Sequence, residues 1–149
     1  MKSSPITSLT RYLLLSFAAF ILSAPPLYAQ DAKPGEAKKN LAVLWTSGDP
    51  EVAHRVAFLY TLNAKKQKWF DQVQLTIWGP SQRLVVADKE IRAYLKKIQD
   101  AGVTVEACVN CAKAYGIADE LKALGIEVKP MGVPLTEFLK KPDWEVLSF

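Results

Sequence analysis

Cysteine and histidine are scarce in this sequence, which has two cysteines and one histidine. A structural zinc site takes four ligands, mostly from these two residue types. Cys108, Cys111 and His54 are the whole supply, so we expect no metal site. The chain also lacks the G-x-G-x-x-G and G-x-x-x-x-G-K-[ST] patterns that bind nucleotide phosphates, and we expect no cofactor.

Long blocks of positive charge are absent as well. The lysines at Lys65, Lys66 and Lys68, and at Lys96 and Lys97, have the spacing of solvated helix ends and faces. No basic stretch is long enough to indicate a nucleic-acid partner, and we expect none.

The apolar run of residues 12–23 is shorter than the roughly 20 residues that cross a bilayer. It follows Lys2 and Arg11 and precedes a proline pair and Ala29, an order typical of a secretory signal peptide. We therefore expect residues 1–29 to be a signal peptide that is cleaved near Ala29. The protein would then be periplasmic or secreted, with no membrane contact after cleavage. An uncleaved N-terminal anchor is the alternative.

The remaining chain has the pattern of one α/β domain. Residues 30–40 are polar and predict a flexible mature N-terminus, and the domain is expected over 41–149. Apolar runs suited to strands alternate there with helical patterns. The expected strands are residues 41–45, 73–78, 103–107, 126–128 and 144–149. This alternation predicts a single compact domain with a mainly parallel five-stranded sheet flanked by helices.

The first helix is expected to begin at Pro50, with Asp49 as its N-cap, and to run to about Ala64. Its apolar residues recur at helical spacing and predict the buried face. These residues are Val52, Val56, Leu59 and Tyr60. Residues 84–87 are ambiguous, and a short helix is expected over 134–140 after a turn at 131–133.

In parallel sheets, binding sites form where the carboxyl ends of the strands meet. Four loops of this chain are expected at that edge. They supply the candidate pocket residues Ser47, Gly48, Trp78, Gly79, Asn110 and Met131. Reactive side chains occur in one of these loops, Cys108-Val109-Asn110-Cys111.

The C-x-x-C spacing of Cys108 and Cys111 is compatible with three kinds of chemistry. At a helix start it favours a thiolate and predicts a redox pair. It also supplies half of a tetrahedral metal site. In an oxidising compartment the two sulfurs would instead form an inert local disulfide, which adds little stability because the loop is short.

The segment Gly102-Val103-Thr104-Val105-Glu106-Ala107-Cys108-Val109-Asn110-Cys111-Ala112, with Gly116 after it, resembles the DsrE/DsrF-like family. The Trp78-Gly79-Pro80 turn and the 125–128 segment support the resemblance, which covers residues 41–149. The family includes the sulfur-relay subunits of the Dsr and Tus systems.

The resemblance implies a compact α/β fold, often assembled into homo-oligomers. It also implies a persulfide-carrying cysteine at the end of the third strand, which Cys108 matches. Cys111 matches a second cysteine of many uncharacterised members that the relay subunits lack. Export, and Ala114-Tyr115 where many members have basic residues, argue against tRNA thiolation.

We therefore expect thiol or persulfide chemistry outside the cytoplasm, although the sequence leaves enzymatic activity open. The Cys108 thiolate would attack a sulfane-sulfur donor or a disulfide, and Cys111 would resolve the product. The partner would be a sulfur donor or acceptor protein or a small thiol. The alternative is a non-catalytic module that binds a small molecule or a protein, with a structural Cys108–Cys111 disulfide.

His54, in the first turns of the first helix, has two interpretations. It is a candidate proton partner for the Cys108 thiol. The plainer interpretation is a helix residue that stacks on Phe58 one turn later.

Overall fold

The computed structural model describes residues 39–149 and contains a five-stranded sheet with all strands parallel, in the order β4-β3-β2-β1-β5. The strands are β1 (Asn40–Trp45), β2 (Val73–Ile77), β3 (Thr104–Cys108), β4 (Glu127–Lys129) and β5 (Trp144–Ser148). The expected fold class is thus confirmed, and each strand lies within one or two residues of its expected bounds. The expected signal peptide and residues 30–38 lie outside the described part of the chain.

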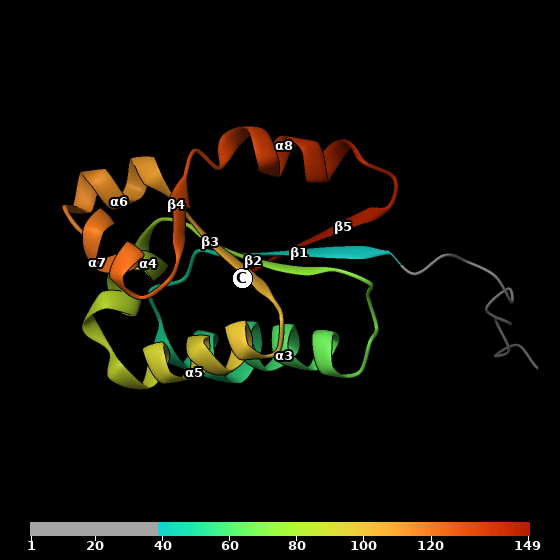
Figure 1. Ribbon diagram of the computed structural model, residues 1–149, viewed down its shortest axis with the longest axis horizontal. Helices are drawn as coiled ribbons and strands as arrows, with labels where there is room; N and C mark the ends of the chain where they lie inside the picture. Colours follow the sequence, from blue (N-terminus) through green and yellow to red (C-terminus); the bar gives the residue numbers. More distant parts are fainter. Residues whose placement is uncertain (1–38) are drawn as a thin grey trace, which may run out of the picture. The chain divides into compact units, whose positions relative to one another are not determined.

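Helices cover both faces of this sheet (Figure 1). Along the chain they are α2 (Pro50–Val52), the π-helix η1 (Ala53–Ala57), α3 (Phe58–Lys66), α4 (Pro80–Ala87), α5 (Lys89–Asp100), α6 (Val109–Tyr115), α7 (Ala118–Ala123) and α8 (Gly132–Lys140). Helices α3 and α5 lie against one face and α8 against the other, while α4, α6 and α7 gather at one end of the sheet. None of the helices in residues 39–149 combines the length and the apolar character needed to cross a membrane.

The two faces of the sheet differ in polarity. The core cluster takes alternate residues from the central strands, among them Val43, Leu75 and Val105, which are partners in the sheet register. The residues between them face the other way. That second face buries Gln74, Thr76 and Glu106, so its interior holds hydrogen-bonding groups as well as apolar ones.

Glu106 is the centre of a buried polar network on this second face. Its carboxylate accepts a hydrogen bond of 2.7 Å from the Gln74 amide and pairs with the Lys129 ammonium at 2.6 Å. Gln74 also donates to the Thr76 hydroxyl at 3.4 Å. Charged groups are rarely buried unless they are paired, and this pairing explains how an acidic residue is accommodated in the interior of β3.

The predicted buried face of the first helix is wrong. Val56 and Leu59 are 41% and 48% exposed, and the helix packs on the sheet through Ala53, Ala57 and Phe58. Both faces of this helix are apolar, so helical periodicity does not choose between them. Small side chains at Ala53 and Ala57 allow the helix to approach the sheet closely, which leaves the larger residues outside.

Local signals set most helix ends correctly. Asp49 caps α2 by accepting the Glu51 N–H at 2.8 Å, and Gly116 ends α6 with a left-handed φ of 71°. The ambiguous stretch belongs to α4. Helix α8 begins at Gly132, earlier than expected, because the Leu135 N–H already bonds to the Met131 carbonyl at 3.0 Å.

Candidate functional site

The carboxyl ends of β1 and β2 are joined by the first turn of α4. The Ser81 hydroxyl, which is fully buried, donates to the Trp45 carbonyl at 2.8 Å. The Trp78 N–H donates to the same carbonyl at 3.0 Å. The loops that follow these two strands are therefore held together, as the parallel arrangement predicts.

Gln82 extends this connection to β3. Its side chain is fully buried, and its amide nitrogen donates to the carbonyls of Ile77 and Cys108, each at 3.0 Å. The amide oxygen has no hydrogen-bond partner among the described residues. The amide is oriented by its two carbonyl acceptors, and a single side chain thus fixes the spacing between the ends of β2 and β3.

Cys108 occupies the last position of β3 and is 3% exposed. The expected attack of the Cys108 thiolate on a donor requires an accessible sulfur, which the described conformation does not provide. The strand still pairs at this residue, with Lys129 of β4 as its partner. The Cys108 side chain shares the face of Glu106, since side chains alternate along a strand.

Cys111 is the more accessible of the two cysteines. It lies in α6, half-buried, and both cysteines are free thiols. Burial raises the pKa of the Cys111 thiol, and the adjacent Cys108 thiol raises it further, while a hydrogen bond from the Gly79 backbone lowers it. The net direction is upward, so the neutral thiol is favoured over the thiolate that we expected at this motif.

Gly79 has a backbone conformation that suits glycine. With φ 69° and ψ −135° it stands immediately before α4, and Pro80 follows as the first helical residue. A β-carbon built on Gly79 would meet nothing within 4 Å, so the requirement for glycine comes from the backbone angles and not from crowding. In this conformation the Gly79 backbone forms a hydrogen bond with the Cys111 thiol. The turn after β2 therefore contacts the segment that follows β3.

The expected pocket residues divide into three groups. Trp78 and Gly79 are half-buried and Asn110 is exposed, beside the cysteine pair in sequence or in space. Met131 is fully buried and does not line an open pocket, because it packs inside as the residue before α8. The structure therefore places Met131 in the interior.

Ser47 and Gly48 belong to the loop after β1. The Ser47 hydroxyl accepts the Asp49 N–H at 3.1 Å, which makes it part of the helix-capping turn. Gly48 is exposed, and a β-carbon there would lie 3.3 Å from the Pro80 β-carbon. Gly48 thus permits the close approach of the loops after β1 and β2.

His54 lies in η1 among aromatic rings. Its ring centroid is 5.7 Å from that of Tyr94 and 6.4 Å from that of Phe58. Phe58 and Tyr94 also contact each other, edge to face at 5.3 Å. These contacts agree with the interpretation of His54 as a packed helix residue, and among the described residues they do not link it to either cysteine.

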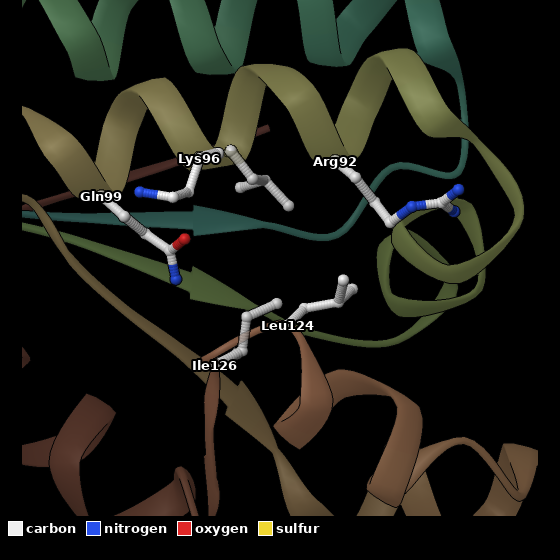
Figure 2. A pocket seen from close by; sticks show the side chains of 6 residues that line it. Arg92, Lys96, Gln99, Leu124 and Ile126 are labelled. Carbon is white, nitrogen blue, oxygen red and sulfur yellow. The ribbon is translucent and has the colours of Figure 1, made fainter.

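A small hollow, distant in sequence from the cysteines, lies between α5 and the start of β4 (Figure 2). It measures about 90 Å³, and Arg92, Gln99 and Ile126 are among its lining residues. The Arg92 guanidinium donates to the Val86 carbonyl at 2.5 Å, and the Gln99 amide donates to the Gly125 carbonyl at 3.3 Å. These polar groups already form hydrogen bonds with backbone carbonyls of the protein, so we assign no chemistry to the hollow.

Sequence reasoning missed two buried polar side chains, Gln82 at this edge and Glu106 on the second face of the sheet. No local pattern marks Gln82, because its side chain bonds to carbonyls at the ends of two different strands. An acidic residue inside the apolar run 103–107 was the signal for Glu106. Among residues 39–149, no three histidine, cysteine or acidic side chains gather closely enough to hold a metal ion.

The chain is thus a small α/β protein with a parallel sheet and two free cysteines near the carboxyl edge of that sheet. The chain belongs to the DsrE/DsrF-like family, whose family model matches residues 39–149. The fold is therefore that of a family related to sulfur relay.

The solved structures that resemble the chain include the following two. A conserved protein of unknown function from Bacteroides thetaiotaomicron, BT1422, is 33% identical, with a TM-score of 0.71, and the match covers 74% of this chain and 95% of that one. The ychN protein of E. coli is 15% identical, with a TM-score of 0.60, over 74% of this chain and 99% of that one, and supports the fold alone. No curated protein matches the sequence.

Proposed function

We propose that this protein accepts and passes on sulfane sulfur through Cys108 and Cys111, outside the cytoplasm. The observation that carries the proposal is the location of two free thiols at the carboxyl edge of a parallel sheet, where Cys111 meets the backbone of Gly79. Membership of a family related to sulfur relay supports it. The donor and acceptor would be a protein or a small thiol.

The difference in burial assigns the two cysteines different tasks. Cys111 is the first to meet a donor because it is half-buried, whereas Cys108 is 3% exposed. The sequence predicted the opposite order, with Cys108 as the attacking thiolate and Cys111 as the resolving thiol. Cys108 is the resolving thiol, which lies next to Cys111 and is protected from the solvent.

The chemistry begins when the Cys111 thiol loses its proton to solvent. Its thiolate attacks a terminal sulfur of an inorganic polysulfide, a sulfur–sulfur bond forms, and the shortened polysulfide leaves with the electron pair of the broken bond. An acceptor thiolate then removes the outer sulfur from the Cys111 persulfide. Without an acceptor, the Cys108 thiolate attacks the Cys111 sulfur, which forms a disulfide and releases hydrosulfide.

Mass spectrometry of the reduced protein after exposure to inorganic polysulfide tests this proposal. We expect one added sulfur on Cys111 in a Cys108→Ser variant, because the resolving thiol is then missing. The Cys111→Ser variant should gain far less sulfur, since Cys108 is buried. Absence of added sulfur from both variants and from the unaltered protein would remove the proposal.

The structure also offers support for a second function, a binding module in which the cysteines are inert. The raised pKa of the Cys111 thiol and the burial of Cys108 both favour unreactive sulfurs. The same experiment separates the two functions, because an inert pair gains no sulfur.

Export is a separate part of the proposal. It is supported by the order of charged, apolar and small residues within residues 1–29. N-terminal sequencing of the protein isolated from its host should find Gln30 as the first residue. A chain that retains Met1 or the apolar run would contradict cleavage.

A further inference from the structure

Helices α4 and α6 contact each other at two levels beside the cysteines. At the first level, the backbone of Gly79, which stands immediately before α4, forms a hydrogen bond with the Cys111 thiol. At the second level, the Arg83 guanidinium lies 4.9 Å from the centroid of the Tyr115 ring. Each member of the second contact follows a member of the first by four residues, which is about one helical turn. Arg83 therefore lies about one turn away from the Cys111 thiol.

Arg83 differs from the other arginines that the structure describes, because it has no polar partner there. The Arg55 guanidinium lies 3.5 Å from the Glu51 carboxylate, and the Arg92 guanidinium donates to a backbone carbonyl at 2.5 Å. Among the described residues, Arg83 contacts the Tyr115 ring and forms neither a hydrogen bond nor an ion pair. An aromatic ring orients a guanidinium without using its N–H groups, so those of Arg83 are free to bind an anion.

Acidic side chains do not compete for this guanidinium within its two helices. Helices α4 and α6 contain no acidic residue, and α6 adds a second exposed cation, Lys113. The acidic residues of the adjoining elements are engaged elsewhere. Asp49 caps α2, Asp119 of α7 pairs with Lys122 at 3.0 Å, and Glu120 lines a separate hollow. The side of α6 that faces α4 is therefore positively charged.

We propose that Arg83, oriented by Tyr115, selects small anionic donors of sulfane sulfur for Cys111. The half-buried position of Cys111 favours a small donor, of which inorganic polysulfide is the simplest. A thiolate and an anionic donor repel each other as they approach, and a cation one turn away lowers this repulsion. The inference rests on the proposed sulfur transfer through Cys111 and adds to it the charge of the donor.

Methanethiosulfonate reagents test this preference at the sulfur atom itself, because one reaction is available with three different charges. In each case the Cys111 thiolate attacks the divalent sulfur, a disulfide forms, and methanesulfinate leaves with the electron pair of the broken sulfur–sulfur bond. An anionic sulfonatoethyl reagent and a cationic trimethylammonioethyl reagent are compared with the neutral methyl reagent. The protein carries Cys108→Ser, so that a single thiol reacts. Mass spectrometry follows the rate at low ionic strength.

We expect Arg83→Gln to lower the rate of the anionic reagent about three- to tenfold relative to the neutral reagent. The rate of the cationic reagent should rise relative to the neutral one. Division by the neutral rate removes any change in the population of the thiolate, so the ratio reports the charge that the reagent meets. Inorganic polysulfide should add sulfur to Cys111 more slowly by a similar factor, and concentrated salt should reduce all of these differences.

The role of Tyr115 as a positioning residue has its own pair of variants. Tyr115→Leu removes the ring that orients the guanidinium and should produce part of the loss seen in Arg83→Gln. Tyr115→Phe keeps the ring and should retain the preference for the anionic reagent. Arg83→Lys keeps the positive charge and should retain most of the preference as well, although an ammonium lacks the planar set of N–H donors.

Arg55→Gln is the matched control for the loss of one positive charge. The Arg55 side chain is 77% exposed and belongs to η1, away from the contact between α4 and α6. This substitution changes the net charge of the protein as much as Arg83→Gln does, and it should leave the ratio of anionic to neutral rates unchanged. Circular dichroism should report the same helix content for every variant.

The outcomes separate this inference from the proposed sulfur transfer. Equal ratios of anionic to neutral rates with and without Arg83, while polysulfide still adds sulfur to Cys111, would overturn the inference alone. A preference for the anionic reagent that depends on Arg83, in a protein that gains no sulfur from polysulfide, would support an anion-selective thiol and remove the sulfur transfer. A Cys111 thiol that reacts with none of the reagents would overturn both.

Discussion

The side-chain amide of Gln82 donates a hydrogen bond of 3.0 Å to the backbone carbonyl of Cys108. The same nitrogen bonds to the Ile77 carbonyl. A residue of α4 thus holds the end of β3, and with it the first cysteine of the pair. The position of the thiols is a property of three neighbouring loops and not of the C-x-x-C segment alone.

Replacing Gln82 with methionine should destabilise the protein by about 2 kcal/mol, because two buried carbonyls lose their donor. The measurement is the free energy of unfolding in urea. Gln99→Met is the matched control, since Gln99 makes one longer bond at the surface and should cost less than about 0.5 kcal/mol. Equal effects of the two substitutions would contradict the anchoring role of Gln82.

Replacing Gly79 with alanine should also destabilise the protein, by about 1 to 3 kcal/mol, because the φ of 69° strains any residue with a β-carbon. The space around Gly79 is open, so strain and not a clash is the cause. Gly132→Ala is the control, because Gly132 has room for a β-carbon without a left-handed φ and begins a helix. Its unfolding free energy should stay the same or increase.

Much of the fold follows from local sequence patterns. Alternating apolar runs predicted the parallel sheet, and Asp49 predicted the first helix start. The choice of buried face in the first helix did not follow, because Val56 and Leu59 are as apolar as the residues that pack on the sheet. That choice depends on how closely small side chains let the helix approach.

The sequence predicted which edge of the sheet holds the two cysteines, but it did not predict how accessible each thiol is to solvent. The carboxyl ends of parallel strands meet at one edge, which brought Gly79 and Cys111 together as expected. The burial of Cys108 is a property of the packed fold, and the hydrogen bond from Gln82 to the Cys108 carbonyl joins residues far apart in the chain. Neither relationship leaves a periodic signal in the sequence.

The Cys111 thiol should react with iodoacetamide at a higher pH than an unperturbed cysteine. Burial and the neighbouring Cys108 raise its pKa, so less thiolate is present at neutral pH. Cys108→Ala removes the second cause and should shift the pH profile of alkylation downward. Mass spectrometry of the modified peptide over a pH series provides the measurement.

A Cys111 profile that does not move in the Cys108→Ala variant would mean that the two sulfurs do not interact. Unfolded protein in urea supplies the reference profile of a cysteine free of burial. Midpoints that coincide in the folded and unfolded protein would contradict a raised pKa altogether.

Lys129→Met should destabilise the protein on the order of 2 kcal/mol, because it leaves the buried Glu106 carboxylate without its cation. The loss is smaller than for a fully buried pair, since the Lys129 side chain is 34% exposed. The double variant Glu106→Gln with Lys129→Met should recover much of this loss, because no charge is then left uncompensated. Lys122→Met, at an exposed pair with Asp119, is the control and should change stability by less than about 0.5 kcal/mol.

The pH dependence of the Lys129→Met difference has a defined direction. Glu106 raises the pKa of Lys129 above its ordinary value of about 10.4. A group whose pKa is raised on folding stabilises the native state below the pKa of the unfolded chain, and this contribution disappears as the pH rises through the folded value. The stability difference between the unaltered protein and Lys129→Met should therefore be constant near neutral pH and shrink in alkaline solution. Urea unfolding over a pH series measures it, and a difference that instead shrank toward acidic pH while persisting in alkali would show that the Lys129 charge is not what stabilises this strand pair.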